Sequence, residues 1–228
     1  MRKLTSFFNI FSEAKGKEKY IRNLINRMST VDNAKSSYES ISFKAHREAE
    51  ILNDKDLIPV LVDLISNSRS QDMKSSRNAA YFILSKLVQK FEEHEALQFL
   101  INQLRLESDQ YVISSMLDRI SELNKPDFIE IDPIFQFVHH QDWAIRHSAI
   151  RALKKSRNPE ARKVILDIIL RSKEDFRKNK GDIIYSISTL SDIGNTEDLD
   201  LLEELSIIKI RDIKESAAFA IERINKRQ

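Results

Sequence analysis

The sequence contains no cysteine among its 228 residues, and this absence excludes several classes of function. Without thiols the chain can form no disulfide bond, no thiolate metal site and no cysteine nucleophile. The absence fits a reducing compartment, so we predict a cytoplasmic location. The five histidines do not have the spacing of three or four converging metal ligands, so we expect no metal and no cofactor.

Glycine and proline are scarce, with three and four residues. Turns between strands use these residues heavily, so their scarcity predicts helices joined by short loops. Three glycines could hardly supply a phosphate-binding loop or a Gly-x-Ser-x-Gly nucleophile motif. We therefore predict an all-α protein that is not an enzyme.

No apolar run approaches the roughly 18 residues that a transmembrane helix needs, so we expect no membrane partner. The first eleven residues contain a short apolar region, but Thr5, Ser6 and Asn9 interrupt it and no small-residue cleavage site follows. We interpret residues 1–16 as a capping or frayed segment, with Phe7, Phe8 and Phe11 packed on the first helices. A secretion signal and an interfacial membrane helix are the alternatives.

One stretch, Asp142-Trp-Ala-Ile-Arg-His-Ser-Ala-Ile-Arg-Ala-Leu153, has the pattern of an amphipathic helix with a small residue, Ala149, facing a neighbour. Weaker copies of this pattern recur along the chain. The positions equivalent to Leu153 are Leu84, Ile120, Leu153, Leu190 and Ile221. The intervals of 36, 33, 37 and 31 residues indicate stacked supersecondary units.

A second amphipathic segment lies within each interval, so each repeat is a helix pair. These segments are Leu57–Ile65, Ala96–Leu104, Asp132–Val138, Pro159–Leu170 and Thr196–Leu205. A further pair, from Lys17–Met28 and Ser36–Leu52, precedes them. We predict a single domain over residues 1–228, with an atypical first pair over 17–54 and five repeats over 55–225.

The Asp142 repeat, followed by Asn158-Pro-Glu-Ala, resembles HEAT repeats of the bacterial HEAT-like, phycobilisome-lyase-type class. The resemblance implies a right-handed α/α superhelix of about six antiparallel helix pairs, whose second helices line a concave side. It also implies that Asp142 and Arg146 belong to the scaffold, capping the turn and bonding between repeats. Arg77 and Lys214 occupy the place of Arg146 in two other repeats.

If the second helices line a groove, their inward positions can be predicted from the helical spacing. The inward rows are Asn78, Phe82, Ser85 and Lys86; Ser114, Asp118, Ser121 and Glu122; His147, Arg151, Lys154 and Lys155; Ile184, Ser188, Ser191 and Asp192; and Glu215, Phe219, Glu222 and Arg223. Phosphate binding along a nucleic acid requires cations in consecutive rows, and here the signs alternate, which argues against a nucleic-acid partner.

The basic third row permits two interpretations. Arg151 and Lys155 could form exposed ion pairs with Asp118 and Glu122 of the preceding row, or the row could bind a ligand. Charge is also banded along the chain, with twelve cations and five anions over residues 139–180 and three cations and nine anions over residues 182–215. This banding suits an acidic partner and a solvated face equally well.

We predict a non-catalytic protein–protein interaction scaffold that holds a protein or peptide in its groove. An acidic partner is one option, and the oligomeric state is open. The predicted contact residues are His147, Arg151, Lys154 and Lys155, with Asp118 and Glu122 as neighbours. We expect Trp143, at the start of its helix, to pack on the adjacent repeat.

Two alternatives come from other classes. The first is an immunity or inhibitor protein that neutralises a toxin, a use that small HEAT-like proteins have. The second is an enzyme similar to the HEAT-like DNA glycosylases for alkylated bases, whose Trp-x-Arg-Arg helix the Trp143 segment resembles. The chain departs from that pattern, because His147 stands where a second arginine is expected and no aromatic–acid cluster lies nearby. No residue set suits a tetrapyrrole, which argues against a phycobilin lyase.

Overall fold

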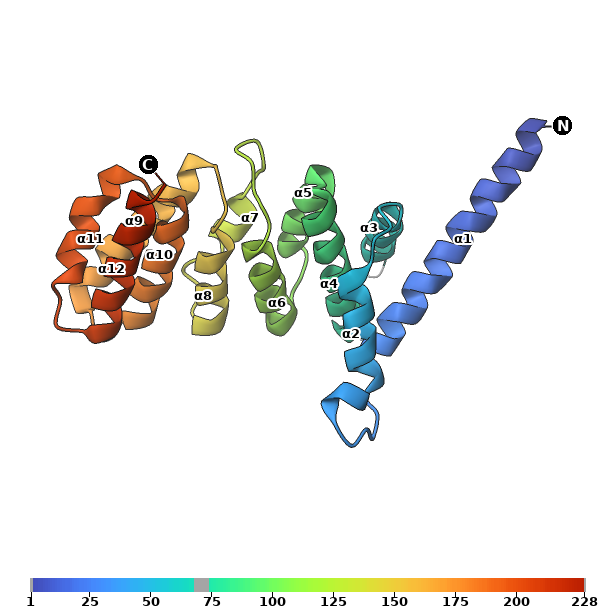
Figure 1. Cartoon of the computed structure of the whole chain (residues 1–228), viewed down its shortest axis with the longest axis horizontal. Coiled ribbons are helices and arrows are strands. Elements are labelled where there is room, and N and C mark those ends of the chain that lie inside the picture. Colours follow the sequence, from blue (N-terminus) through green and yellow to red (C-terminus); the bar gives the residue numbers. More distant parts are fainter. Residues whose placement is uncertain (1, 68–73, 228) are drawn as a thin grey trace. The chain divides into compact units, whose positions relative to one another are not determined.

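The computed structural model describes the backbone of residues 2–67 and 74–227, with side chains from Ala14 onward. In these residues the regular structure is helical, apart from one isolated bridge between Lys125 and Ser156 (Figure 1). The predicted all-α class is confirmed.

The α-helices of the described residues follow one another with short connections. They are α1 (Arg2–Met28), α2 (Ile41–Ile51), α3 (Leu57–Asn67), α4 (Lys74–Phe91), α5 (His94–Asn102), α6 (Gln110–Ser121), α7 (Asp132–Phe135), α8 (Trp143–Ala152), α9 (Pro159–Ser172), α10 (Lys180–Ile193), α11 (Leu199–Ser206) and α12 (Arg211–Asn225). Short 3-10 turns occupy Ser37–Glu39, Gln103–Arg105, Lys173–Asp175 and Thr196–Asp198. Taken two by two, these helices are the six predicted pairs.

The predicted and observed boundaries differ most at the N-terminus. Helix α1 begins at Arg2, so it includes the backbone of residues 2–16, whose role as a capping or frayed segment stays a prediction. The predicted packing of Phe7, Phe8 and Phe11 lies outside the described side chains. Helix α7 is only one turn long, with Pro133 in its first turn, so it is the shortest first helix among the described pairs.

The chain divides into two compact units, residues 1–100 and 101–228, here called the N-terminal and C-terminal units. In the N-terminal unit α1 packs against α2, α3 and α4. The apolar faces supply its core, which includes Leu24, Leu61, Ile83 and Leu84. Ala45 and Ala49 of α2 are fully buried, and such small side chains allow close helix packing.

In the C-terminal unit the second helices of the pairs pack in sequence, with α6 on α8, α8 on α10 and α10 on α12. The first helices α9 and α11 pack on α10 and α12. Ala149, at the predicted small position of α8, is fully buried together with Ile150 and Leu153. Each pair thus buries its apolar stripe against its neighbours, as in stacked repeats.

The register of the last helix differs from the predicted one. In α12 the buried residues are Ile213, Ala217, Ala220 and Ile224, whereas the predicted marker Ile221 is half-buried. Helix α12 is the last helix of the described chain and packs on α10 and α11. The buried stripe of α12 therefore runs through positions 213, 217, 220 and 224, which are three or four residues apart and lie on one face of the helix.

Lys125, in the loop after α6, is fully buried at 0% exposure. Its Nζ donates to the carbonyl oxygens of Ile120 (2.8 Å), in the last turn of α6, and of Leu123 (2.7 Å), two residues beyond the helix. Its backbone N–H donates to the Lys155 carbonyl (2.9 Å), so it ties the loop after α6 to the loop after α8. Burial lowers the pKa of Lys125 to about 7, because it disfavours the charged amine.

Among the described residues, no helix combines the length and the apolar character that crossing a membrane requires.

Candidate functional site on the second helices of the C-terminal unit

The six predicted contact residues lie on α6 and α8 or directly after them. Together with the corresponding residues of α10 and α12 they make up what we call the second-helix face.

Asp142 precedes α8 and caps its first turn. Its carboxylate accepts hydrogen bonds from the backbone N–H of Ala144 (2.8 Å) and of Ile145 (3.4 Å). An aspartate at this position satisfies N–H groups that have no partner inside the helix. Asp109 caps α6 in the same way, by accepting from Tyr111 and Val112.

Arg146 connects α8 to the next pair and to its own preceding turn. Its Nε donates to Asp182 Oδ1 of α10 (2.9 Å), and its NH1 donates to the carbonyl oxygen of His140 (2.6 Å). Asp182 lies in the first turn of α10, where the helix dipole favours a carboxylate. Burial by itself would raise the pKa of Asp182, but hydrogen bonds from His147 and Arg146 outweigh burial and lower it.

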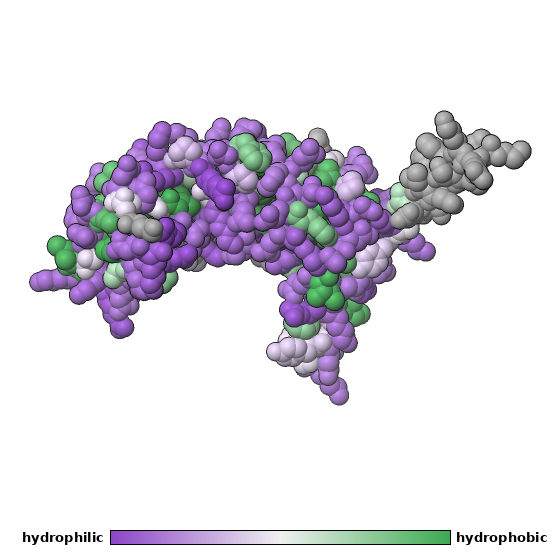
Figure 2. All heavy atoms as spheres, turned by 45° about the horizontal axis from the view of Figure 1, so that its top comes forward, coloured by the Kyte–Doolittle hydropathy of each residue, from purple (hydrophilic) through white to green (hydrophobic). Residues whose placement is uncertain are grey.

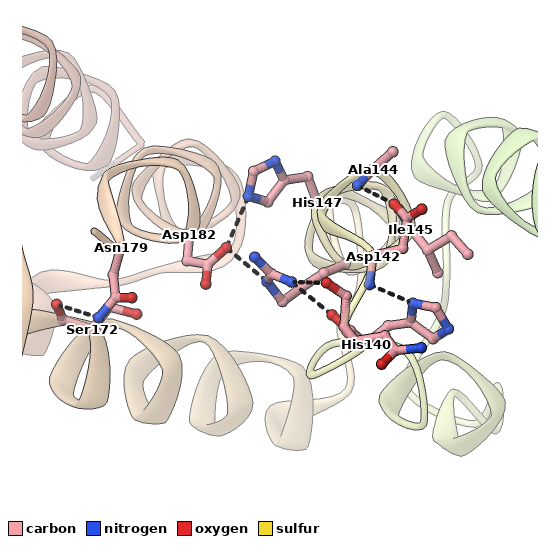
Figure 3. A network of polar contacts seen from close by, with 10 residues as sticks. His140, Asp142, Ala144, Ile145, His147, Ser172, Asn179 and Asp182 are labelled. Carbon is pink, nitrogen blue, oxygen red and sulfur yellow. Dashed lines mark hydrogen bonds and ion pairs between the residues drawn. The ribbon is translucent and has the colours of Figure 1, made fainter. Parts of the chain in front are cut away.

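His147 also points toward Asp182, with 2.8 Å between Nε2 and Oδ1 (Figure 3). Its ring stacks on Tyr185 of α10 with 4.3 Å between centroids, and it lies against Gly181. A Cβ atom at position 181 would come within 2.6 Å of the imidazole, so this close approach requires glycine. His147 is therefore held by α10 on several sides, and its buried Nδ1 has no hydrogen-bond partner among the described residues.

Trp143 lies one turn before His147, with 5.7 Å between the ring centroids. Contrary to the expectation that it packs on the adjacent repeat, the side chain is 65% exposed. The reason is its place at the first position of α8, on the same stripe as His147 and Arg151 rather than on the buried stripe of Ala149. The Trp143 ring is therefore exposed to solvent at the N-terminal end of the second-helix face.

The predicted charged pairs between α6 and α8 are present. Arg151 NH1 lies 3.3 Å from Asp118 Oδ1. Lys155 Nζ donates to the Glu122 carbonyl oxygen (2.8 Å) and lies 3.7 Å from the Glu122 carboxylate. All four side chains are substantially exposed, so each pair contributes only about 0–1 kcal/mol to folding.

Other contacts extend this network to α10 and α12. Lys154 Nζ donates to Ser188 Oγ (2.9 Å), and burial, followed by the nearby charge of Arg151, lowers the pKa of Lys154. The backbone N–H of Lys155 donates to Asp192 (2.8 Å), which also pairs with Arg223 of α12 (3.3 Å). The basic row is therefore already bonded to the rows on both sides.

These inter-helix pairs share one feature, a sequence separation close to the repeat period. The separations are 33 residues for Asp118–Arg151, 36 for Arg146–Asp182, 37 for Lys155–Asp192 and 31 for Asp192–Arg223. Arg162 of α9 and Asp198, also 36 residues apart, form a bidentate pair in which Asp198 is 1% exposed. Opposite charges one period apart are the signal in the sequence that identifies Asp182 and Asp198, neither of which is among the predicted contact residues.

Lys214 and Arg77, which occupy the place of Arg146 in two other repeats, lie in different surroundings. Lys214 is exposed, and its side chain forms no ion pair or hydrogen bond with the described residues. Arg77 lines a cavity of about 290 Å³ in the N-terminal unit, with Arg22, Ile25 and Leu64 among the other lining residues.

The stacked helix pairs define a helical repeat protein, and comparison with known proteins agrees. Residues 97–181 match the family model described as HEAT repeats, which supports the resemblance to HEAT repeats found in the sequence. An engineered protein solved by the Northeast Structural Genomics Consortium aligns with a TM-score of 0.54 at 16% identity, covering 90% of this chain and 96% of that one. A designed armadillo repeat protein aligns with a TM-score of 0.52 at 15% identity, covering 89% and 99%.

At these identities the two structures show the fold alone, which is of the armadillo and HEAT type. No curated protein matches the chain. Among the described residues, no group of three or more histidine, aspartate and glutamate side chains is placed to hold a metal ion.

Proposed function

We propose that this protein is a non-catalytic protein-interaction scaffold whose partner binds the second-helix face of the C-terminal unit. The HEAT and armadillo fold supports the general class, because stacked helix pairs offer extended surfaces for proteins. The single observation that carries the specific surface is Trp143, which is largely exposed and lies on the same stripe as His147 and Arg151. Tryptophan is enriched among the residues that dominate binding energies at protein interfaces.

The charged residues around Trp143 suit the rim of such an interface. Exposed ion pairs such as Asp118–Arg151 contribute little to folding, so the charged groups of a partner can replace them at small cost. Because each cation of the basic row already contacts an acid, a carbonyl or a hydroxyl, we propose a partner surface that carries both signs of charge. Ion pairs between this partner surface and the second-helix face would then select among partners and guide their orientation.

The test is affinity capture from the native cells, with bound proteins quantified by mass spectrometry. We expect the wild-type chain to enrich one or a few proteins and Trp143→Ala to lose them. Ile207→Ala is the matched control, because Ile207 is an exposed apolar residue at the end of α11 and away from the second-helix face. Equal capture of the same proteins by wild type and Trp143→Ala would contradict the proposal.

The two alternatives stay predictions with separate tests. A toxin found as the captured protein, and inhibited by this chain, would identify an immunity protein. A gel shift with duplex DNA that weakens steeply with salt would favour the glycosylase-like alternative. The single domain over residues 1–228 and the cytoplasmic location also stay predictions.

A further inference from the structure

Four aromatic rings form a strip on the N-terminal unit, which we call the aromatic strip. Tyr38 and Phe43 are in edge contact, with 5.1 Å between centroids and an interplanar angle of 72°. His46 of α2 and Phe82 of α4 are in edge contact at 5.2 Å and 67°. Phe43 and His46 are three residues apart on α2, which places them on one face of the helix. The strip therefore runs from the turn before α2 across to α4.

The strip is accessible to solvent. Tyr38 is 74% exposed, the neighbouring Ile41 is also exposed, and the other three rings are half-buried. The surface seen in Figure 2 is largely hydrophilic with small hydrophobic patches. Single exposed apolar residues are common, whereas contiguous ones indicate a binding surface.

Local hydrogen bonds hold the strip in place. Ser40 caps α2 by accepting from the Phe43 N–H (3.1 Å), and Asp32 accepts from the Ile41 N–H (2.7 Å). The His46 ring is fixed by the 2.8 Å contact of its Nδ1 with the Ser42 carbonyl oxygen, to which Nδ1–H can donate. A partner would meet rings that are already ordered, which reduces the entropy lost on binding.

The charge around the strip is positive at its α4 end. Lys86 Nζ lies 5.6 Å from the Phe82 ring centroid, and Lys44 follows Phe43 along α2. Neither lysine forms an ion pair with a described residue. Helix α4 carries the cations Lys74, Arg77, Lys86 and Lys90 and no acid.

The acids of α2 are already engaged. Glu48 is held by Arg27 and by Tyr20, and Glu50 is paired with Arg47. Glu39, at the Tyr38 end, is the remaining acid of this turn and helix. The lysines next to Phe43 and Phe82 are therefore available to carboxylates of a partner.

We propose that the aromatic strip docks an acidic amphipathic helix of a protein partner. Its apolar side chains would cover Tyr38, Phe43 and Phe82, and its carboxylates would pair with Lys44 and Lys86. This inference rests on the proposed function only in that the chain binds proteins. It adds a second contact surface, on the other unit, and it specifies the chemistry of the bound segment.

The experiment measures fluorescence anisotropy of labelled synthetic probes with the full chain. The first probe is a 15-residue peptide (on the order of four helical turns) with leucine and phenylalanine at helical spacing and glutamate elsewhere. The second replaces each glutamate with lysine, the third is a scrambled acidic peptide, and the fourth is a single-stranded oligothymidine. We expect saturable binding of the first probe, at least about tenfold tighter than that of the other three.

Variants locate the binding site. We expect Tyr38→Ala to weaken binding of the first probe about fivefold, and Lys44→Glu with Lys86→Glu to weaken it at least tenfold. The melting temperature should change little, because Tyr38 and Lys44 are exposed and Lys86, which is half-buried, forms no ion pair with a described residue. The controls are Ile207→Ala for the apolar change and Arg177→Glu with Lys178→Glu for the charge reversal. Both lie on the C-terminal unit and should leave binding unchanged.

Several outcomes overturn the inference: no binding of the acidic peptide, equal binding of the lysine peptide or the scrambled peptide, preference for the oligonucleotide, or equal effects of strip and control variants. Light scattering of the free chain adds one more outcome. Self-association that Tyr38→Ala abolishes would show that a second copy occupies the strip. Because the probes are purified, failure here leaves the Trp143-dependent capture intact, and failure of that capture leaves peptide binding to the strip intact.

Discussion

The second helices of the two units use their exposed faces in opposite ways. In the N-terminal unit the contact between His46 and Phe82 joins α2 to α4, and the adjacent lysines Lys44 and Lys86 have no described acid partner. In the C-terminal unit the second helices are joined by ion pairs and hydrogen bonds, such as Asp118–Arg151 and Lys154–Ser188. One architecture therefore carries an open aromatic and basic surface in one unit and an internally bonded polar surface in the other.

This difference separates two uses of charge in a helical repeat. Where opposite charges lie one period apart, they bond consecutive repeats and help to set the register of stacking. Where cations lie beside aromatic rings without acids, their charge is available to a partner. The comparison predicts that polar substitutions affect stability most in the C-terminal unit.

Arg162→Met should destabilise the chain most. The buried carboxylate of Asp198 accepts hydrogen bonds from both Nε and NH2 of Arg162. Removing the guanidinium therefore leaves a buried carboxylate without its cation. We expect a loss of about 3–5 kcal/mol in the free energy of unfolding, measured by urea titration. Lys163→Met, next in sequence but in an exposed pair with Glu160, should cost less than about 0.5 kcal/mol. Similar losses for both variants would contradict the comparison.

Gly181→Ala should come next, with a loss of about 1–3 kcal/mol, because the added methyl would collide with His147 and displace it from Tyr185. Thermal unfolding measures the effect. In the N-terminal unit Gly16→Ala is the matched control, since no atom lies within 4 Å of the added Cβ. It should stabilise helix α1 by about 0.5–1 kcal/mol. A neutral Gly181→Ala would show that the His147 contacts do not constrain α8 and α10.

Lys125 should make stability depend on pH. The pKa of Lys125 is about 7 in the folded chain, whereas the ordinary value for lysine, 10.5, applies to the unfolded chain. Between pH 7 and pH 10.5 the unfolded chain therefore binds a proton at Lys125 that the folded chain does not bind. The free energy of unfolding should therefore rise with pH from about 7 to about 10.5, by at most about 1.4 kcal/mol per pH unit. Below pH 7 both states are protonated and this dependence disappears.

The measurement for Lys125 is a series of urea titrations across this range for wild type and Lys125→Met. The informative quantity is the difference between the two chains in the slope of the free energy of unfolding against pH, because the other titrating groups are present in both chains. Parallel curves would mean that the amine keeps its proton in the folded chain.

Arg151→Gln should have the smallest effect, about 0–1 kcal/mol, because its pair with Asp118 is exposed. Added salt should reduce the difference between this variant and wild type further, since salt screens exposed charges. A loss above about 2 kcal/mol would show that the network acts cooperatively rather than as separate surface pairs.

Much of the fold could be predicted from periodicity. The repeated markers placed a second helix at or beside Leu84, Ile120, Leu153 and Leu190, and each predicted intervening segment contains a helix. Local rules sufficed for the caps as well, because Asp142 and Asn158 accept hydrogen bonds from the backbone two residues on. These features depend on residues close in sequence.

The candidate site could be predicted only in part. The helical spacing placed Arg151 and Lys155 opposite Asp118 and Glu122, and the structure contains both pairs. It missed Asp182 and Tyr185, which hold His147, because contacts between helices depend on the distance and rotation of two separate elements. The aromatic strip was missed for the same reason, since Tyr38 and Phe82 come from a turn and a helix 44 residues apart.

The sequence by itself determined the helical class, the repeat period and the residues that can pair at one-period separation, because these follow from hydrophobic spacing and side-chain chemistry. The tertiary structure alone decided which cations are bonded and which are open, that Trp143 is exposed and that Lys125 is buried. The physical reason is that burial and pairing depend on how closely neighbouring helices approach. In this protein small residues such as Gly181 and Ala149 allow neighbouring helices to approach closely.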